Sequence, residues 1–191
     1  MSDSKPHNSM NEMDIIKMVE EDAWMMDVLR EAEKLNLPDS MIGAGFLRNR
    51  VWDKLHGKKR DDADISDIDL VYFDAKDTQE SDKELSQKMK GVLGADWEIV
   101  NQSYTHTWHD REISYKNTAE AISEWVETPT CVAVTLVDGQ PKIIAPHGID
   151  DLVNLIVRPV PSRRRDLKLF YHRIESKGWL KKWPKLKIVL N

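Results

Sequence analysis

The run from Ile68 to Phe73 (Ile-Asp-Leu-Val-Tyr-Phe) constrains the fold of this 191-residue chain more than any other segment. Its β-branched and aromatic residues predict a strand, and its apolar positions should be buried. Asp67 and Asp69 interrupt the apolar pattern at positions i and i+2, which project from the same face of a strand. Two carboxylates side by side in partly buried surroundings repel each other and lose solvation, so they need a cation.

Helical and strand patterns alternate along the rest of the chain. Helices are expected over residues 14–35, 46–56, 81–93, 118–126, 149–157 and 163–177, and strands at 41–42, 97–101, 132–137 and 142–145. Asp138-Gly139, between the last two strands, predicts a hairpin and therefore at least one antiparallel pair. We expect an α/β (α+β) fold, in which helices flank a mixed β-sheet within a single domain.

The length of the chain suits one domain with a tail. Residues 1–12 are polar and lack periodicity, so they are expected to form a flexible N-terminal tail before a domain over residues 13–191. No stretch reaches the ~18 apolar residues of a membrane span, and residues 1–10 have no apolar core typical of a secretory signal. The single cysteine, Cys131, excludes an internal disulfide framework. These features favour a cytoplasmic protein without a membrane partner.

The charge is unevenly distributed. The formal net charge is −5, but the segment from Arg158 onward has eleven Lys or Arg against two Asp or Glu, which leaves −14 for the remainder. The overall negative charge argues against a protein that forms a stable coat on DNA. The basic segment, about residues 160–191, is either a solvated helix and tail or an edge that attracts a polyanion such as nucleotide phosphates or RNA.

A small-residue turn, Gly43-Ala44-Gly45, precedes the helix predicted over residues 46–56. Small residues let a phosphate approach the backbone, and a helix N-terminus offers N–H groups and a positive dipole end. Arg48 lies one turn into this helix and can reach the same anion. The carboxylate pair beyond it suits Mg²⁺, which phosphoryl-transfer sites commonly hold with one or two carboxylates and substrate phosphates.

The block from Met41 to Asp74 resembles the head of the DNA polymerase beta-like nucleotidyltransferase superfamily. That superfamily has a small-residue turn, a helix, and then a strand bearing Asp-x-Asp. Residues 44–49 (Ala-Gly-Phe-Leu-Arg-Asn), with Gly57 later, are similar to the Gly-Gly-x-Val-Arg-Asp…Gly run of tRNA nucleotidyltransferases. Alanine and asparagine replace the first glycine and the aspartate, so the match is not to those enzymes themselves.

A closer resemblance is to a functionally unassigned family of bacterial nucleotidyltransferase-like proteins, and it covers nearly the whole folded chain. They share an Ile-Gly-Ala-Gly-Phe-x-Arg-Asn-x-Val-Trp-Asp opening and an Asp-Ile-Asp strand. They also share a Val-x-Asn-Gln segment and a Leu-x-Asn-Leu-Val-Val-Arg-Pro end, which residues 100–102 (Val-Asn-Gln) and 152–159 match here. This resemblance implies a nucleotidyltransferase fold without implying a substrate.

The superfamily pattern also includes a third carboxylate on a neighbouring strand. In the strand predicted over residues 97–101, either Glu98 or Asn101 can face the pair, but not both, because they differ by three positions. Glu98 is the better ligand chemically, so the expected catalytic and metal-binding residues are Asp67, Asp69 and Glu98 with Mg²⁺ or Mn²⁺. The expected substrate-binding residues are Gly43, Ala44, Gly45, Arg48, Asn49 and Ser66.

Two further pairs of residues allow two interpretations each. His106 and His109 could serve a metal or act as a base, or they could be satisfied polar residues of a loop or strand. Trp179 and Trp183 could stack on a base, or pack the basic tail back onto the domain.

The combined pattern predicts a metal-dependent nucleotidyltransferase that moves a nucleotidyl group from a nucleoside triphosphate to an acceptor hydroxyl. The acceptor could be RNA, a protein or a small molecule. Because a fold does not fix a function, two alternatives stay open: a non-catalytic nucleotide-binding or regulatory module, and a partner in a toxin–antitoxin-type pair.

Overall fold

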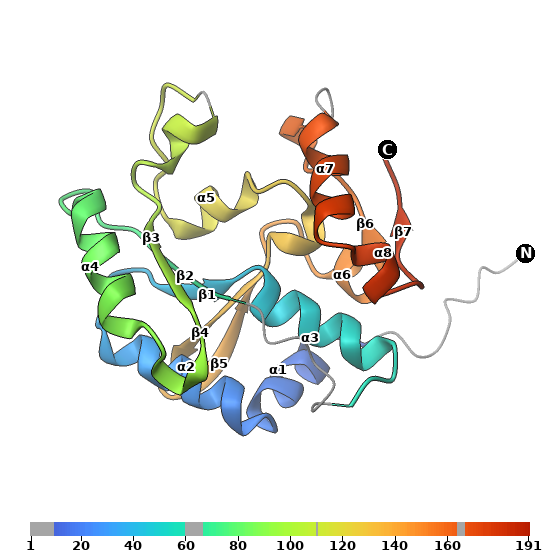
Figure 1. Ribbon diagram of the computed structural model, residues 1–191, viewed down its shortest axis with the longest axis horizontal. Helices are drawn as coiled ribbons and strands as arrows, with labels where there is room; N and C mark the ends of the chain where they lie inside the picture. The colour runs from blue at the N-terminus through green and yellow to red at the C-terminus, as the bar shows by residue number, and fades with distance from the viewer. Residues whose placement is uncertain (1–9, 60–66, 110, 164–166) are drawn as a thin grey trace, which may run out of the picture.

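The computed structural model describes residues 10–59, 67–109, 111–163 and 167–191, so most of the predicted tail over residues 1–12 lies outside the description. A five-stranded sheet in the order β3-β2-β1-β4-β5 forms the centre (Figure 1). Its strands are β1 (Met41–Gly43), β2 (Ile68–Tyr72), β3 (Trp97–Asn101), β4 (Ala133–Val137) and β5 (Gln140–Ile144). β2 and β3 are parallel and the other neighbours antiparallel, which confirms the predicted mixed sheet.

Helices surround this sheet. They are α1 (Glu12–Glu20), α2 (Ala23–Lys34), α3 (Gly45–Leu55), α4 (Gln79–Met89), α5 (Thr118–Ser123), α6 (Asp150–Val153), α7 (Lys168–Ser176) and α8 (Trp179–Lys182). Short 3₁₀ turns are η2 (Val92–Gly94), η3 (Thr105–His109), η4 (Thr128–Thr130) and η5 (Pro161–Arg163). β6 (Ile156–Val157) and β7 (Lys187–Ile188) form a small parallel pair. Within the described ranges, no helix is long and apolar enough to cross a membrane.

Several predicted element boundaries were wrong. The helix expected over residues 14–35 is two helices, because the Asp22 carboxylate accepts the Met25 N–H at 3.2 Å and caps α2. The helix expected from residue 81 begins at Gln79 after Thr78, and the helix expected over 118–126 ends at Ser123. The segment 149–157 is helical only in α6 and then joins β6. The described part of the predicted basic helix begins at Lys168.

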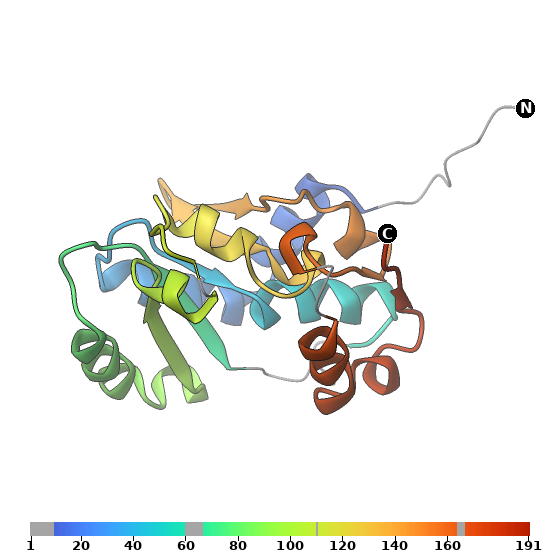
Figure 2. The ribbon, with the colours of Figure 1, turned by 90° about the horizontal axis from the view of Figure 1, so that it is seen from above.

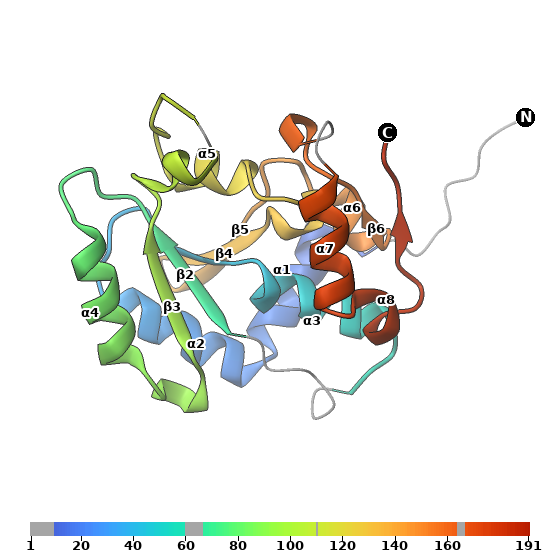
Figure 3. The same cartoon turned by 45° about the horizontal axis from the view of Figure 1, so that its top comes forward.

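The two faces of the sheet are covered differently. Ile68, Leu70 and Tyr72 of β2 are fully buried on one face, where α1 and α2 pack (Figure 3). The alternate residues Asp69 and Val71 point to the other face, where Val71 belongs to a smaller apolar cluster with Ile122 of α5, among others. α5 covers only part of this second face, so the end of β2 that carries Asp69 has room for a site.

At the β3 edge of the sheet, side chains rather than another strand accept hydrogen bonds from the backbone. β3 is one of the two edge strands, and α4 lies along it. The Ile99 N–H donates to Ser86 Oγ at 3.0 Å, and the Asn101 N–H donates to the buried Asp82 carboxylate at 2.9 Å. These bonds satisfy edge donors that would otherwise be available to another strand.

The C-terminal helices complete the second face from the side of α3. The views of Figures 1 and 2 agree that α7 and α8 lie beside α3. Trp179 and Trp183 are buried and pack edge-on against Trp52 of α3, with ring centroids 5.4 and 5.1 Å apart. The Trp183 Nε1–H also donates to Asp53 Oδ1 at 2.7 Å. The interpretation in which these tryptophans pack the basic tail onto the domain is therefore confirmed.

Candidate active site

Three carboxylates share the second face of the sheet. Asp67 and Asp69 occupy alternate positions at the start of β2, and the parallel register places Glu98 of β3 directly opposite Asp69. Asn101 points to the other face, where its side chain accepts the Asp74 N–H and donates to the Asp74 carbonyl. Of the two candidates on β3, the structure therefore places Glu98 on the carboxylate face.

Asp69 has a raised pKa. Burial raises its pKa to about 6, and the neighbouring Glu98 carboxylate adds to the rise, while Arg48 and Lys177 oppose it. The charge of this buried carboxylate is poorly solvated. A positively charged ligand therefore stabilises it more than it would stabilise a carboxylate exposed to water.

A cavity of about 670 Å³, here named the polar cavity, opens over this face. One wall comes from the turn before α3 and from the two strands: Ala44, Gly45, Arg48, Asn49, Asp67, Asp69 and Glu98. The opposite wall comes from α7 and α8: Arg173, Ser176, Lys177, Gly178, Trp179, Lys182 and Trp183. The cavity thus brings three carboxylates and four basic side chains together, and the predicted basic edge faces the predicted acidic pair.

The turn that leads into α3 has a strained backbone. Ala44 adopts φ 51° and ψ −120°, a region that residues with a Cβ rarely occupy, at a cost of about 1–3 kcal/mol. Its carbonyl accepts the Arg48 N–H at 3.1 Å, and its own N–H donates to the Val132 carbonyl at 3.0 Å. These bonds fix the strained residue at the floor of the polar cavity.

Gly43 has a different role from the expected one of giving a phosphate access, since it lines neither this cavity nor the next one described. A Cβ at this position would lie 2.5 Å from Cη2 of Trp125. The glycine therefore allows an indole ring to pack against the end of β1. Ser66, the last of the predicted substrate-binding residues, lies outside the described residues.

Arg48 is buried, with 4% of its surface exposed. Its guanidinium donates to Asn49 Oδ1 and, at 2.8 Å, to Thr130 Oγ1, and its central carbon lies 4.5 Å from the centroid of the Trp179 ring. Burial lowers its pKa to about 10 despite the nearby Glu127 carboxylate, so the group stays charged at neutral pH. Arg48 therefore joins α3 to η4 and α8 while it supplies positive charge to the cavity.

A buried ion pair continues this network. Glu127 is fully buried, accepts the Thr130 hydroxyl at 2.8 Å, and accepts Nε of Arg173 at 2.8 Å. Neither Glu127 nor Arg173 was predicted as a site residue, because their pairing joins positions 46 residues apart. The pair fixes the Arg173 side chain of α7 beside the carboxylates.

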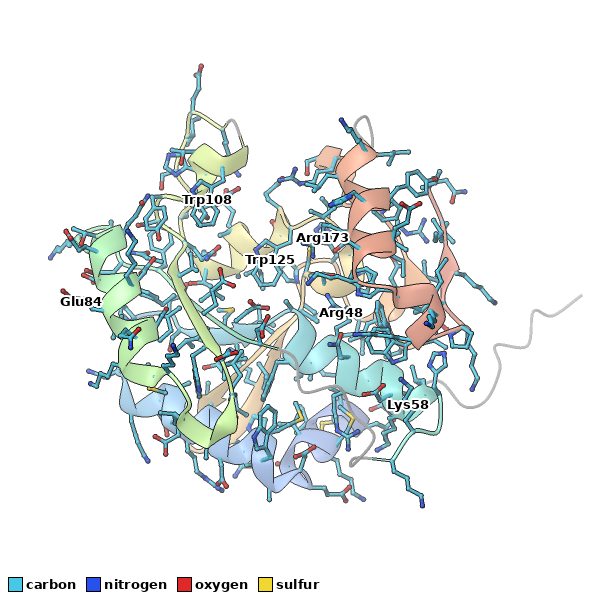
Figure 4. All side chains as sticks on the ribbon, in the orientation of Figure 1. Arg48, Lys58, Glu84, Trp108, Trp125 and Arg173 are labelled. Carbon is cyan, nitrogen blue, oxygen red and sulfur yellow. The ribbon has the colours of Figure 1, made fainter. Side chains whose placement is uncertain are left out.

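A second cavity of about 310 Å³, here named the aromatic cavity, adjoins the first. Ala44, Asp69, Glu98 and Arg173 line both. The remaining lining residues are Val71, Val100, Gln102, Thr105, Trp108, Trp125, Val126 and Thr130. Figure 4 labels three of the lining residues: Trp108 on η3, Trp125 just after α5, and Arg173 on α7.

The predicted metal function of the histidines has no support from His106, and the side chain of His109 lies outside the description. His106 contacts the Ser103 carbonyl through Nδ1 at 3.0 Å and lies edge-on to the Tyr115 ring, and it lines neither cavity. Across the ranges that the structure describes, no group of three or more His, Cys, Asp or Glu side chains is placed to hold one metal ion. The donor chemistry of Asp67, Asp69 and Glu98 nevertheless fits Mg²⁺ or Mn²⁺, because all three offer carboxylate oxygens.

Comparison with known proteins agrees with this architecture. A family model described as nucleotidyltransferase matches residues 30–188. A protein whose NMR structure reveals a CCA-adding enzyme head domain is 30% identical, with a TM-score of 0.83, over 94% of this chain and 96% of its own. Among curated proteins, no sequence matches significantly.

Larger enzymes share the fold alone. A CCA-adding enzyme in complex with CTP is 17% identical, with a TM-score of 0.53, and the match covers 92% of this chain but 42% of that enzyme. A tRNA-processing enzyme in its apo form is 19% identical, with a TM-score of 0.52 and 44% of its length covered. The mixed sheet, the helices on it and the match over residues 30–188 together show that this chain belongs to the nucleotidyltransferase family.

Proposed function

We propose that this chain is a metal-dependent nucleotidyltransferase that uses a nucleoside triphosphate as donor and a hydroxyl group as acceptor. The observation that carries the proposal is the polar cavity, where Asp67, Asp69 and Glu98 face the basic side chains of α7 and α8. An acidic cluster opposite a basic wall suits a divalent cation together with a polyphosphate.

Each part of the cavity has a role in this proposal. Asp67, Asp69 and Glu98 would hold Mg²⁺ or Mn²⁺, which when bound would neutralise the carboxylates and draw charge from the phosphate oxygens. Lys177 and Lys182 provide cations for the β- and γ-phosphates. Further contacts with the phosphates are proposed for the residues of the turn and α3 that line the cavity: Ala44, Gly45, Arg48 and Asn49.

The reaction balances as a displacement at the α-phosphorus. The acceptor oxygen forms a bond to that phosphorus while the bond to the pyrophosphate oxygen breaks, and the hydroxyl proton passes to a carboxylate of the site. The basic wall neutralises the charge that gathers on the departing pyrophosphate. The protein contributes chiefly positioning and charge stabilisation.

The test is pyrophosphate release and transfer of label from radiolabelled ATP, CTP, GTP and UTP, with Mg²⁺ or Mn²⁺. RNA, protein extract and small hydroxyl compounds serve as acceptors. Transfer should fall at least about 100-fold in Asp67→Asn and Asp69→Asn, since each change removes a charged oxygen donor. The matched control, Asp27→Asn, alters an exposed carboxylate of α2 and should leave transfer unchanged. Transfer that survives both site substitutions would refute the proposal.

A second candidate is a nucleotide-binding or regulatory module without turnover. The observation that favours it is that the described side chains include no convergent set of three metal ligands. Such a module would bind a nucleoside triphosphate equally well with EDTA and with Mg²⁺, and would release no pyrophosphate with any acceptor. Binding that requires the metal, together with turnover, selects the enzyme.

A further inference from the structure

We infer that the aromatic cavity is the nucleobase subsite for the donor nucleotide, with Trp108 as its stacking surface. This inference rests on the proposed function, because the polar cavity must first hold the triphosphate. Beyond that function, the inference assigns the nucleobase of the substrate to the aromatic cavity and names the side chains that would contact the base.

The shared lining of the two cavities sets the direction in which a nucleotide would lie. Asp69 and Glu98 border both cavities, so an α-phosphate beside them has the basic wall on one side and the aromatic cavity on the other. The β- and γ-phosphates require the cations of α7 and α8. The nucleoside, which is joined to the other side of the α-phosphate, then has the aromatic cavity as the adjoining space.

The chemistry of the aromatic cavity suits a flat, uncharged ring. Trp108 is 60% exposed, which is unusual for a large aromatic side chain and leaves a ring face open for stacking. Its edge-on contact with Tyr104, at a centroid distance of 5.7 Å, braces the indole. Val71, Val100 and Trp125 provide apolar walls.

Two polar side chains can read the edge of that ring. Gln102 is buried, with 3% of its surface exposed, and its Nε2 donates to the Val100 carbonyl at 3.2 Å. A primary amide has a second N–H and an oxygen with two lone pairs, so Gln102 can still donate and accept. The Thr105 hydroxyl donates to the main-chain carbonyl of Gln102 at 3.1 Å and also lies 3.4 Å from Gln102 Oε1, which leaves one lone pair of that oxygen available.

The charge of the lining argues against a polynucleotide backbone in this cavity. Among the described residues that line it, Arg173 is the one basic residue, and its guanidinium already pairs with Glu127. This described lining therefore offers phosphodiester groups no unpaired cation, whereas a neutral base and ribose need none.

The experiment compares affinities for intact nucleotides and for the phosphate chain alone. Calorimetry with Mn²⁺ measures binding of the α,β-methylene analogues of ATP, CTP, GTP and UTP, which cannot transfer a nucleotidyl group, and of inorganic tripolyphosphate. Trp108→Ala should weaken binding of the tightest analogue about tenfold, as expected for loss of one stacked base. Trp108→Phe should restore most of that affinity. Tripolyphosphate should bind both variants as it binds the wild type.

Tyr171→Ala provides the matched control, since Tyr171 is an exposed aromatic residue of α7 that lines neither cavity, and it should leave all affinities unchanged. If Trp108→Ala left the nucleotide affinity unchanged, or weakened tripolyphosphate equally, the subsite would be refuted while the proposed function stood. If the wild-type protein bound none of the triphosphates, the proposed function would fail, and the subsite with it.

Discussion

Glu98 lies directly opposite Asp69 in the parallel register of β2 and β3, although 29 positions separate the two in the chain. Paired residues of neighbouring strands project to the same face, so the two carboxylates border the same two cavities. Burial is the main cause of the raised pKa of Asp69, and the Glu98 carboxylate adds to it because a nearby negative charge opposes the ionisation of Asp69. A bound divalent cation would remove that opposition.

Glu98→Gln should lower nucleotidyl transfer by about 100-fold or more, because it removes a charged donor and a proton acceptor from the site. Glu98 is exposed, so folding should be unaffected. Glu84→Gln on the neighbouring α4 is the matched control, since Glu84 is an exposed carboxylate that lines neither cavity (Figure 4). Transfer rates and Mn²⁺ affinity would be measured together. Equal rates in the two variants would remove Glu98 from the proposed machinery.

Asp69→Asn should stabilise the protein above pH 6 in EDTA. The native pKa of Asp69, about 6, exceeds the ordinary aspartate value of 3.8, so the native state binds this proton more tightly than the unfolded state. Wild-type stability therefore falls as the pH rises from about 4 through 6. The variant lacks this loss and should gain on the order of 1–2 kcal/mol at pH 7.5, after allowance for the partial exposure of Asp69.

Urea denaturation at pH 4, 5, 6 and 7.5 checks this expectation. The advantage of Asp69→Asn should vanish near pH 4, and Mn²⁺ should stabilise the wild type but not the variant. A difference that stayed constant over the whole pH range would contradict the assigned cause.

Glu127→Gln should destabilise the fold by about 3 kcal/mol, because it leaves the buried Arg48 and the Arg173 guanidinium without their shared counter-charge. Asp27→Asn breaks the exposed pair with Arg30 and should cost less than about 0.5 kcal/mol. Urea midpoints of the two variants provide the comparison. Similar small losses in both would show that the buried pair contributes no more than a surface pair.

Gly43→Ala should cost about 1–3 kcal/mol, because the new Cβ would collide with the Trp125 ring. Trp125→Leu removes the colliding atoms, so adding Gly43→Ala in that background should cost much less. A double-mutant cycle measured by thermal unfolding gives the coupling energy. If the two changes were simply additive, the close approach of the Trp125 ring would not be the reason that position 43 requires glycine.

Local sequence patterns predicted the site residues that lie close together in the chain. The strand over residues 97–101 matches β3, and alternation along β2 placed Asp67 and Asp69 on one face. The period of two residues in a strand makes such assignments independent of distant packing. The hairpin at Asp138-Gly139 followed in the same way from turn chemistry, and both residues have positive φ.

The remaining contacts of the site join residues that are far apart in the sequence. Arg48 was expected to reach an anion, and only the return of α8 to α3 buries its guanidinium beside Trp179. The hydrogen bond from Arg48 to Thr130 joins positions 82 residues apart, and no periodicity indicates such a partner. The ring of Trp125 lines the aromatic cavity and packs against Gly43, 82 positions earlier in the chain. Asp22 divides one predicted helix because its side chain competes for a backbone N–H, a local effect that the continuous apolar pattern concealed.

The construction of the polar cavity from two distant parts of the chain has a consequence for biosynthesis. Residues 44–98 leave the ribosome before α7 and α8 exist, so the nascent protein displays its carboxylate face without the cations that later oppose it. Affinity for a polyphosphate should therefore arise abruptly, once Trp179 and Trp183 have docked on Trp52. Until then, the nascent chain should bind a polyphosphate only weakly.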